Sequence, residues 1–391
     1  MRRMLTKIHR FTGLSIAVFM VVSGMTGSIL AFDPEIDALL NPEFFEISEP
    51  GGAAIGADEI AKSIEESDDR IWVRRIPIRD APTKSIVVYV EPKRDPITGE
   101  IYEVDYDEVF VDPVTAEVTG QRMWGRCCAR QNFVPFVHKI HNRLALPASF
   151  GRPFWGLVGL LWTIMSLIGV YLTIPVMRPV LPAWGRVWGF RRTNPQQRRN
   201  LQIHRAIGLW FSIVSLPVAI SGIGLAMYSD LFRPVVNTLS PITETVWETR
   251  AHQSRGEVFD PPISFTAAMR AAQDQMRTHG ADMKPTAISY SPVRRMYRVE
   301  FGDYLDAGMG ISYAYIDAID SIMTGVTIAG TGSVGDIMDA VIQPLHSGRS
   351  WGMPGRIVVL LLGIAVTLLA TTGTLMWLRK QRKRREQDIV R

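Results

Sequence analysis

Four long stretches without any Asp, Glu, Lys or Arg are the feature that most constrains the fold of this 391-residue sequence. They are residues 11–32, 154–177, 206–229 and 357–378, and each has 22 to 24 residues. A helix of about 20 apolar residues crosses the roughly 30 Å hydrocarbon core of a bilayer. Buried helices of soluble proteins rarely extend this far without a charge, so we predict four transmembrane helices.

The first stretch has a second interpretation, a cleaved signal peptide. Its apolar run is longer than the 7–15 residues typical of such a signal, and no A-x-A cleavage site precedes Asp33. We therefore expect an uncleaved membrane anchor.

The positions of Lys and Arg predict the orientation of the chain. Residues 1–10, 178–205 and 379–391 contain 18 Lys or Arg against two acidic residues. Residues 33–153 and 230–356 carry most of the acidic groups. Cytoplasmic loops are enriched in Lys and Arg, so both termini and the middle loop should be cytoplasmic, with the two long segments outside. In a Gram-negative bacterium the protein would then lie in the inner membrane with these segments in the periplasm.

The amino-acid composition is consistent with apolar membrane spans that alternate with polar segments. A chain that is 47% hydrophobic and 21% charged is not intrinsically disordered, and two Cys cannot build a disulfide scaffold. The net charge of +5 would fit nucleic-acid binding. The excess of Lys and Arg lies in three short segments, however, and this favours a role in membrane topology.

The two outside segments should each form a small α+β domain with one helix on an antiparallel sheet. In the first, residues 57–66 read as a helix, followed by alternating stretches at 71–78, 85–91 and 108–111. In the second, residues 265–278 read as a helix, followed by strands near 286–291, 296–301 and 312–317.

An internal repeat relates the two halves of the sequence. With an offset of 195, Ile8-His9-Arg10 aligns with Ile203-His204-Arg205, and Thr26-Gly27 with Ser221-Gly222. With an offset of 204, Gly169 aligns with Gly373, and one residue of slip aligns His141 with His346. A parallel repeat predicts a pseudo-two-fold axis along the membrane normal, so equivalent residues should face each other at one depth.

The repeat pairs four of the seven histidines. His9 and His204 begin the first and third helices, and His141 and His346 precede the second and fourth. One His near a membrane surface commonly hydrates its ring there, but ionisable groups repeated in both halves are typical of function. His138 shares a helical face with His141 and is an alternative ligand, although Gln343 stands at its repeat position. His252 and His279 have no repeat partner and should be surface residues.

Two facing imidazoles suit the two axial positions of a haem iron. Zinc needs three or four protein ligands, and the spans contain no further His, Cys, Asp or Glu to supply them. No C-x-x-C-H sequence is present, so we expect two non-covalent haem b groups. Two haems at two depths would relay electrons across the bilayer.

Small and basic residues accompany these histidines. Glycines recur along all four spans, where they suit either haem approach or ordinary helix packing. An Arg lies near each proposed ligand and could pair with a haem propionate: Arg10, Arg205, Arg143 and Arg349. For Arg10 and Arg205 the positive-inside bias is an equal explanation.

Cys127 and Cys128 are adjacent and could form a disulfide, remain free thiols or bond between molecules.

Several motifs resemble the PepSY-associated transmembrane family. They are Lys7-Ile8-His9-Arg10 followed by Gly13-Leu14 and residues 23–27, the stretch Phe110-Val111-Asp112-Pro113-Val114-Thr115-Ala116-Glu117-Val118, and Leu345-His346 with residues 352–356. The second resembles the family's "vDPxTGev" hairpin, with Ala116 where Gly is usual. The likeness spans nearly the whole chain.

The resemblance implies a function. The family includes inner-membrane di-haem proteins of Gram-negative bacteria that reduce ferric siderophores, and this sequence is most similar to the FoxB and FpvG type, of which FpvG acts on ferripyoverdine. It implies that the chain reduces Fe(III) so that the siderophore releases Fe(II). It also assigns His9, His141, His204 and His346 as axial haem ligands.

Two other functions stay open at this point. The chain could be a membrane-anchored PepSY module that regulates a peptidase or an envelope process, or a cytochrome b subunit that passes electrons to a partner protein. The sequence has no G-x-G-x-x-G, Ser-His-Asp or H-E-x-x-H pattern, so an unidentified partner should supply the electrons.

Overall fold

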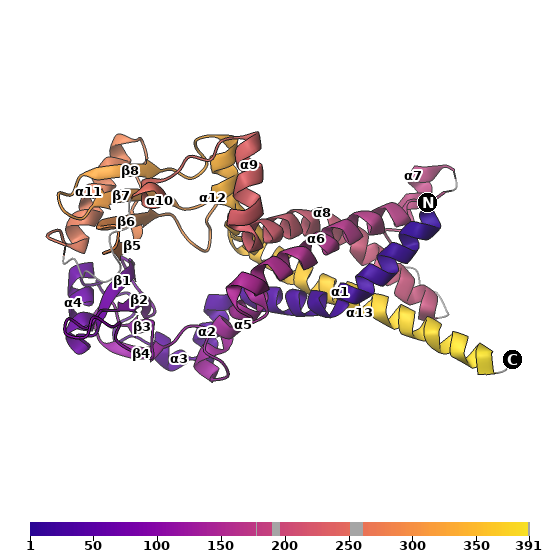
Figure 1. Cartoon of the computed structure of the whole chain (residues 1–391), viewed down its shortest axis with the longest axis horizontal. Coiled ribbons are helices and arrows are strands. Elements are labelled where there is room, and N and C mark those ends of the chain that lie inside the picture. Colours follow the sequence, from indigo (N-terminus) through magenta and orange to yellow (C-terminus); the bar gives the residue numbers. More distant parts are fainter. Residues whose placement is uncertain (177, 190–195, 251–260, 390–391) are drawn as a thin grey trace. The chain divides into compact units, whose positions relative to one another are not determined.

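The computed structural model describes residues 1–176, 178–189, 196–250 and 261–389 (Figure 1). The chain forms two compact units. The helical unit comprises residues 1–32, 137–235 and 342–391, and the sheet unit comprises residues 33–136 and 236–341. Arg191, Arg192 and His252 lie outside the described residues.

The helical unit is a bundle of four long helices. They are α1 (Arg2–Leu30), α6 (Ala148–Thr173), α8 (Gln196–Ala226) and α13 (Gly352–Ile389) (Figure 1). Each contains one of the charge-free stretches and is long and apolar enough to cross a membrane. The chain therefore has the four candidate membrane spans that the sequence predicted.

Packing in the bundle follows the repeat. Helix α1 contacts α13 and α6, and α8 contacts the same two helices. Where α1 crosses α13, a Cβ on Gly24 would lie 2.5 Å from the carbonyl oxygen of Gly363, so two glycines allow the backbones to touch.

Shorter elements flank these helices. Within the helical unit lie α7 (Val180–Gly185), η2 (Tyr228–Phe232) and η3 (Arg349–Trp351). The elements α5 (Phe133–Arg143), α9 (Arg233–Leu239) and α12 (Val334–Ser347) each contribute residues to both units.

The sheet unit contains a single antiparallel sheet of eight strands. Its strands are β1 (Ile71–Pro77), β2 (Ile86–Pro92), β3 (Glu108–Val111), β4 (Val118–Arg122), β5 (Pro285–Ser291), β6 (Met296–Phe301), β7 (Ser312–Asp317) and β8 (Met323–Thr327). Their order is β4-β3-β2-β1-β5-β6-β7-β8.

Each half of the repeat contributes one helix and four strands to this sheet. The helices α4 (Ala57–Ser67) and α11 (Phe265–Thr278) pack on the same face and share a core with alternate residues of the strands. We predicted two separate small domains, but β1 and β5 pair antiparallel and join the halves into one sheet. An unpaired β1 would have left backbone groups open along its length, and pairing it with its repeat equivalent satisfies them.

Two of the eight strands, β4 and β8, are absent from our sequence prediction. Both are five-residue edge strands with a central glycine, Gly120 and Gly325, so their alternation of apolar and polar residues is weak. In the hairpin before β4, Ala116 adopts φ = 63°, the left-handed conformation for which glycine is the usual residue.

The remaining elements of the sheet unit are the short helices α2 (Asp33–Leu40), α3 (Pro42–Phe45), α10 (Val246–Thr249) and η1 (Arg130–Asn132). A buried ion cluster fixes α2 to the end of the sheet. Arg122 lies 2.9 Å from Asp37, also pairs with Glu108 and donates to the backbone oxygen of Gln131. All three charged side chains are less than 10% exposed.

We predict that Arg122→Met strongly destabilises the protein. It leaves two buried carboxylates without their cation, which costs about 3–5 kcal/mol of unfolding free energy. Thermal denaturation of the purified full chain in detergent measures the effect. Lys62→Met is the control, because Lys62 forms a solvent-exposed pair with Glu66. Equal melting temperatures for Arg122→Met and the wild type would contradict this role.

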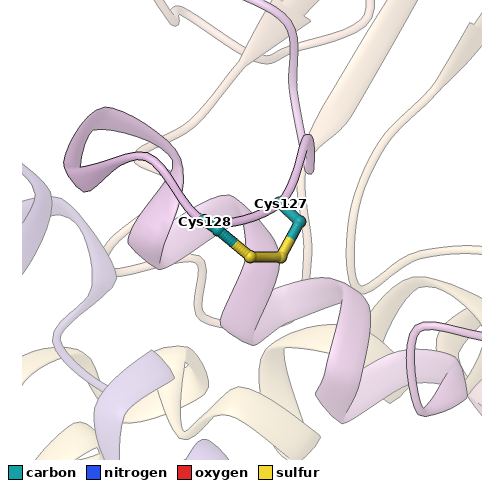
Figure 2. The surroundings of a disulfide bond; sticks show 2 residues. All are labelled: Cys127 and Cys128. Carbon is teal, nitrogen blue, oxygen red and sulfur yellow. A yellow bond between two sulfur atoms is a disulfide. The ribbon is translucent and has the colours of Figure 1, made fainter.

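Cys127 and Cys128 form a vicinal disulfide in the segment between β4 and η1 (Figure 2). Of the three states that the sequence left open, the structure has the intramolecular bond.

The state of these cysteines is measurable by alkylation and mass spectrometry. In the unfolded chain without reductant, we expect neither thiol to react with a maleimide, and after reduction we expect both to react. Two reactive thiols before reduction, or a disulfide-linked dimer on a non-reducing gel, would refute the intramolecular bond.

Candidate cofactor-binding site

The structure brings His9 and His204 together. They lie on α1 and α8, and their ring centres are 6.3 Å apart. Both helices begin several residues before the charge-free stretches, at Arg2 and Gln196, so the two histidines belong to the bundle itself.

A cavity of about 600 Å³ surrounds this pair. Small-molecule sites in proteins commonly have volumes of 300–1,000 Å³. Besides the two histidines, its wall includes four glycines and four basic residues: Gly13, Gly169, Gly208, Gly373, Arg2, Arg10, Arg205 and Lys380. Most of the remaining wall is apolar, so the cavity suits a largely apolar ligand that carries negative charge at one end.

The structure also pairs His141 with His346. They lie near the ends of α5 and α12, with ring centres 6.1 Å apart. Burial lowers the pKa of His141 to about 3 and also lowers the pKa of His346. Both imidazoles are therefore neutral at pH 7 and carry a nitrogen lone pair.

Each of the four histidine rings rests against a glycine of a different helix. The Cε1 atom of each ring would lie 2.9–3.5 Å from a Cβ added to that glycine. The pairs are His9 with Gly169, His204 with Gly373, His141 with Gly27 and His346 with Gly222. Gly27 aligns with Gly222, and Gly169 with Gly373, so the two halves of the repeat hold their histidines in the same way.

A missing Cβ at these positions also exposes a backbone carbonyl. A helical side chain covers the turn before its own Cα, so glycine uncovers the carbonyl four residues earlier. The Nδ1 atom of His9 lies 3.1 Å from the Met165 oxygen, and Nδ1 of His346 lies 3.0 Å from the Val218 oxygen. The carbonyls at the matching positions, four residues before Gly27 and Gly373, belong to Ser23 and Leu369.

Hydroxyl groups next to three of the glycines form a second contact to the same ring nitrogen. Thr26 lies 2.9 Å from Nδ1 of His141, Thr372 lies 3.0 Å from Nδ1 of His204, and Ser221 lies 3.2 Å from Nδ1 of His346. Each hydroxyl donates its one proton to a carbonyl of its own helix. It can therefore only accept from the imidazole.

The carbonyl contacts place the ring proton of His9 and His346 on Nδ1, and the hydroxyl contacts favour the same tautomer for His141 and His204. Because carbonyl and hydroxyl oxygens accept at Nδ1, the ring proton resides on Nδ1 and the lone pair on Nε2. A metal-bound histidine typically donates its other ring N–H to a carbonyl or carboxylate in this manner. The four side chains thus have the donor chemistry of metal ligands. Among the described residues, no group of three or more His, Cys, Asp or Glu could hold a metal ion.

Two layers of paired histidines lie at different levels of the bundle. On α1, His9 marks one level and Gly27, which holds His141, marks the other. Gly27 lies 18 positions after His9, which corresponds to about 27 Å of helix. Between these levels lies an apolar core that contains Ile16, Met20 and Val158, with Phe19 and Phe154 in edge-to-face contact.

Of the four arginines predicted to accompany the histidines, Arg10 and Arg205 line the cavity. The buried Nε atom of Arg10 has no hydrogen-bond partner among the described residues. Arg349 is buried in η3, and Arg143 lies in the last turn of α5.

The other histidines lie elsewhere. His138 bonds through Nδ1 to Asn142 of its own helix, 2.9 Å away, so the geometry favours His141 over its alternative. His279 ends α11 and is exposed.

Sequence reasoning overlooked the hydroxyls of Thr26, Ser221 and Thr372, although each directly precedes a glycine that faces a histidine.

Comparison with known families agrees with this architecture. The pattern of the family described as PepSY-associated TM region matches residues 6–380. No curated protein matches the chain. Because the match covers nearly every residue, including all four long helices and all four paired histidines, the chain belongs to the PepSY-associated transmembrane family.

Proposed function

We propose that this protein is an inner-membrane di-haem b reductase. It carries electrons from the cytoplasm to the periplasm and reduces a ferric siderophore there, releasing Fe(II). The basic termini and the loop at residues 178–205 face the cytoplasm, and the sheet unit lies in the periplasm.

The two histidine pairs are the observation that carries this proposal. Two nitrogen ligands at about 2 Å from one metal ion place their imidazole centres roughly 6 Å apart. The measured separations of 6.3 and 6.1 Å suit this arrangement. With the lone pair on Nε2, each pair would offer two nitrogen ligands to the iron of a b-type haem.

The cavity around His9 and His204 fits the rest of the macrocycle. Its apolar wall would accommodate the porphyrin faces, and Gly13 and Gly208, which have open space where a Cβ would be or only one side-chain contact there, would leave room for a flat group. Arg10 and Arg205 would pair with the propionates, and the buried Nε of Arg10, which has no hydrogen-bond partner in the described part of the chain, would be available for this. When bound, haem supplies reversible one-electron chemistry at iron.

The residues of the chain itself orient the four imidazoles and separate the two histidine layers from water. Hydrogen bonds at Nδ1 hold each imidazole in one rotation and raise its basicity as a ligand. The apolar core between the two layers excludes water and ions from the path. The ferric substrate accepts one electron per turnover and becomes Fe(II), while the identity of that substrate rests on the resemblance to the FoxB and FpvG type.

Haem stoichiometry tests the proposal directly. Purified protein should have a Soret absorption band, and pyridine haemochrome quantitation should give two haem b per chain. His9→Ala and His346→Ala should each lower this value to about one, and the double variant should be colourless. The exposed His279→Ala serves as the control. A colourless wild-type protein would refute the haem assignment and favour a regulatory module.

Substitution of the glycines tests the way in which the rings are held. In Gly222→Ala, the new Cβ would lie 2.9 Å from Cε1 of His346 and would cover the Val218 carbonyl. We expect loss of one haem, from the His141/His346 layer. Gly169→Ala should instead affect the His9/His204 layer. Ile220→Ala, on the exposed side of the same helix as Gly222, should keep both haems. Retention of two haems in Gly222→Ala would contradict this mode of positioning.

Substrate reduction separates a reductase from a cytochrome subunit. Purified protein that has been reduced and freed of reductant should be reoxidised by ferripyoverdine and should release Fe(II) to a ferrous-specific dye. A haem-loaded protein that stays reduced with the ferric siderophore would be an electron carrier for a partner protein instead.

A further inference from the structure

One face of the eight-stranded sheet carries a row of arginine and aromatic side chains. Cross-strand pairing aligns Tyr89 of β2 with Arg75 of β1, Arg75 with Ser289 of β5, Ser289 with Arg298 of β6, and Arg298 with Tyr315 of β7. Strands β1 and β5 are neighbours (Figure 1), and their pairing brings residues from both halves of the repeat into this row.

This row lies on the face opposite α4 and α11. Along β6, Tyr297 and Val299 belong to the core shared with these two helices. Since successive residues of a strand point to opposite faces, Arg298 and Glu300 lie on the other face. Arg298 remains 31% exposed and Arg75 28% exposed, so both can be reached from solvent.

Aromatic rings surround Arg298. Its guanidinium lies 5.0 Å from the ring centre of Trp247 and 5.2 Å from that of Tyr313. Arg294 lies 4.8 Å from the same Trp247 ring. Burial raises the pKa of Tyr313, so its phenol stays a neutral hydrogen-bond donor.

The local charge is positive, in contrast to the acidic composition of the two segments that build this unit. Arg75 is paired with Glu300 at 2.7 Å, and Arg298 lies at 3.7 Å from the same carboxylate. Two other carboxylates lie near this face: Asp317, which pairs with Arg250, and Glu248, which caps α10. The buried Nε of Arg298 has no hydrogen-bond partner among the described residues.

From these contacts we infer that this face binds a negatively charged ferric chelate whose iron ligands are carried on aromatic rings, as in a catecholate. The guanidinium groups of Arg298 and Arg294 attract its negative charge and can lie over its aromatic rings, and Trp247 and Tyr313 hold these guanidinium groups in place and border the site with aromatic surface. The ligand would be the substrate of the proposed reductase, and to that extent the inference rests on the proposed function.

Binding is measurable without electron transfer. The probe is the ferric complex of 2,3-dihydroxybenzoate, mixed with oxidised full-length protein in detergent and quantified by equilibrium dialysis. The neutral ferric complex of acetohydroxamate, which has no aromatic ring, is the comparison ligand. We expect the catecholate complex to bind and the acetohydroxamate complex to bind at least tenfold more weakly.

Substitutions assign the binding to this face. Arg298→Gln removes the charge but keeps most of the side chain, and it should raise the Kd for the catecholate complex about tenfold. Trp247→Leu should weaken binding similarly. The control is Arg277→Gln on the exposed side of α11, which should bind as the wild type does. The absorption spectrum and melting temperature of each variant show whether it is folded.

The outcomes separate the two proposals. Wild-type affinity in folded Arg298→Gln, equal loss in Arg277→Gln, or equal binding of the acetohydroxamate complex would overturn the inference. A colourless protein that still binds the catecholate through Arg298 would refute the haem assignment and leave this binding face standing. A haem-loaded protein that fails to bind the catecholate would refute the face and leave the haem assignment intact.

Discussion

The hydrogen bond from an imidazole Nδ1 to a helix carbonyl exposed by a glycine is the interaction on which the helical unit depends. His9 and His346 make this bond at Gly169 and Gly222, and the rings of His141 and His204 rest in the same way against Gly27 and Gly373. A single missing Cβ makes room for the ring and uncovers the acceptor that orients it. For His9 and His346 the same contact sets the tautomer, so packing, hydrogen bonding and ligand chemistry have one structural cause.

The repeat converts this local contact into two layers. Each half of the chain supplies one histidine to each layer, so neither half can complete a pair by itself. In the sheet unit each half likewise supplies one strand of a pair. Strands β1 and β5 are repeat equivalents, and their backbone groups hydrogen-bond to each other. A duplicated sequence thus creates paired histidines in the bundle and one continuous sheet in the sheet unit.

Much of this organisation could be predicted from the sequence. The four charge-free stretches indicated the spans, and the alignment of His9 with His204 and of His141 with His346 indicated the pairs. Sequence could not tell which glycines face a ring and which, such as Gly24 and Gly363, allow helices to touch, because both kinds suit a membrane helix. Nor could it predict that Arg75 and Arg298, more than 200 residues apart, lie in one row, since this depends on the β1–β5 pairing.

Electron transfer across a sealed bilayer tests the central claim, that two layers of paired histidines form one relay. Proteoliposomes would contain ferric citrate and a ferrous-specific dye inside, with the impermeant reductant dithionite added outside. The account predicts that the dye develops colour with the wild-type protein, and that His9→Ala and His346→Ala each abolish this colour. Equal colour in vesicles without protein, or full activity in either variant, would contradict a relay through both layers.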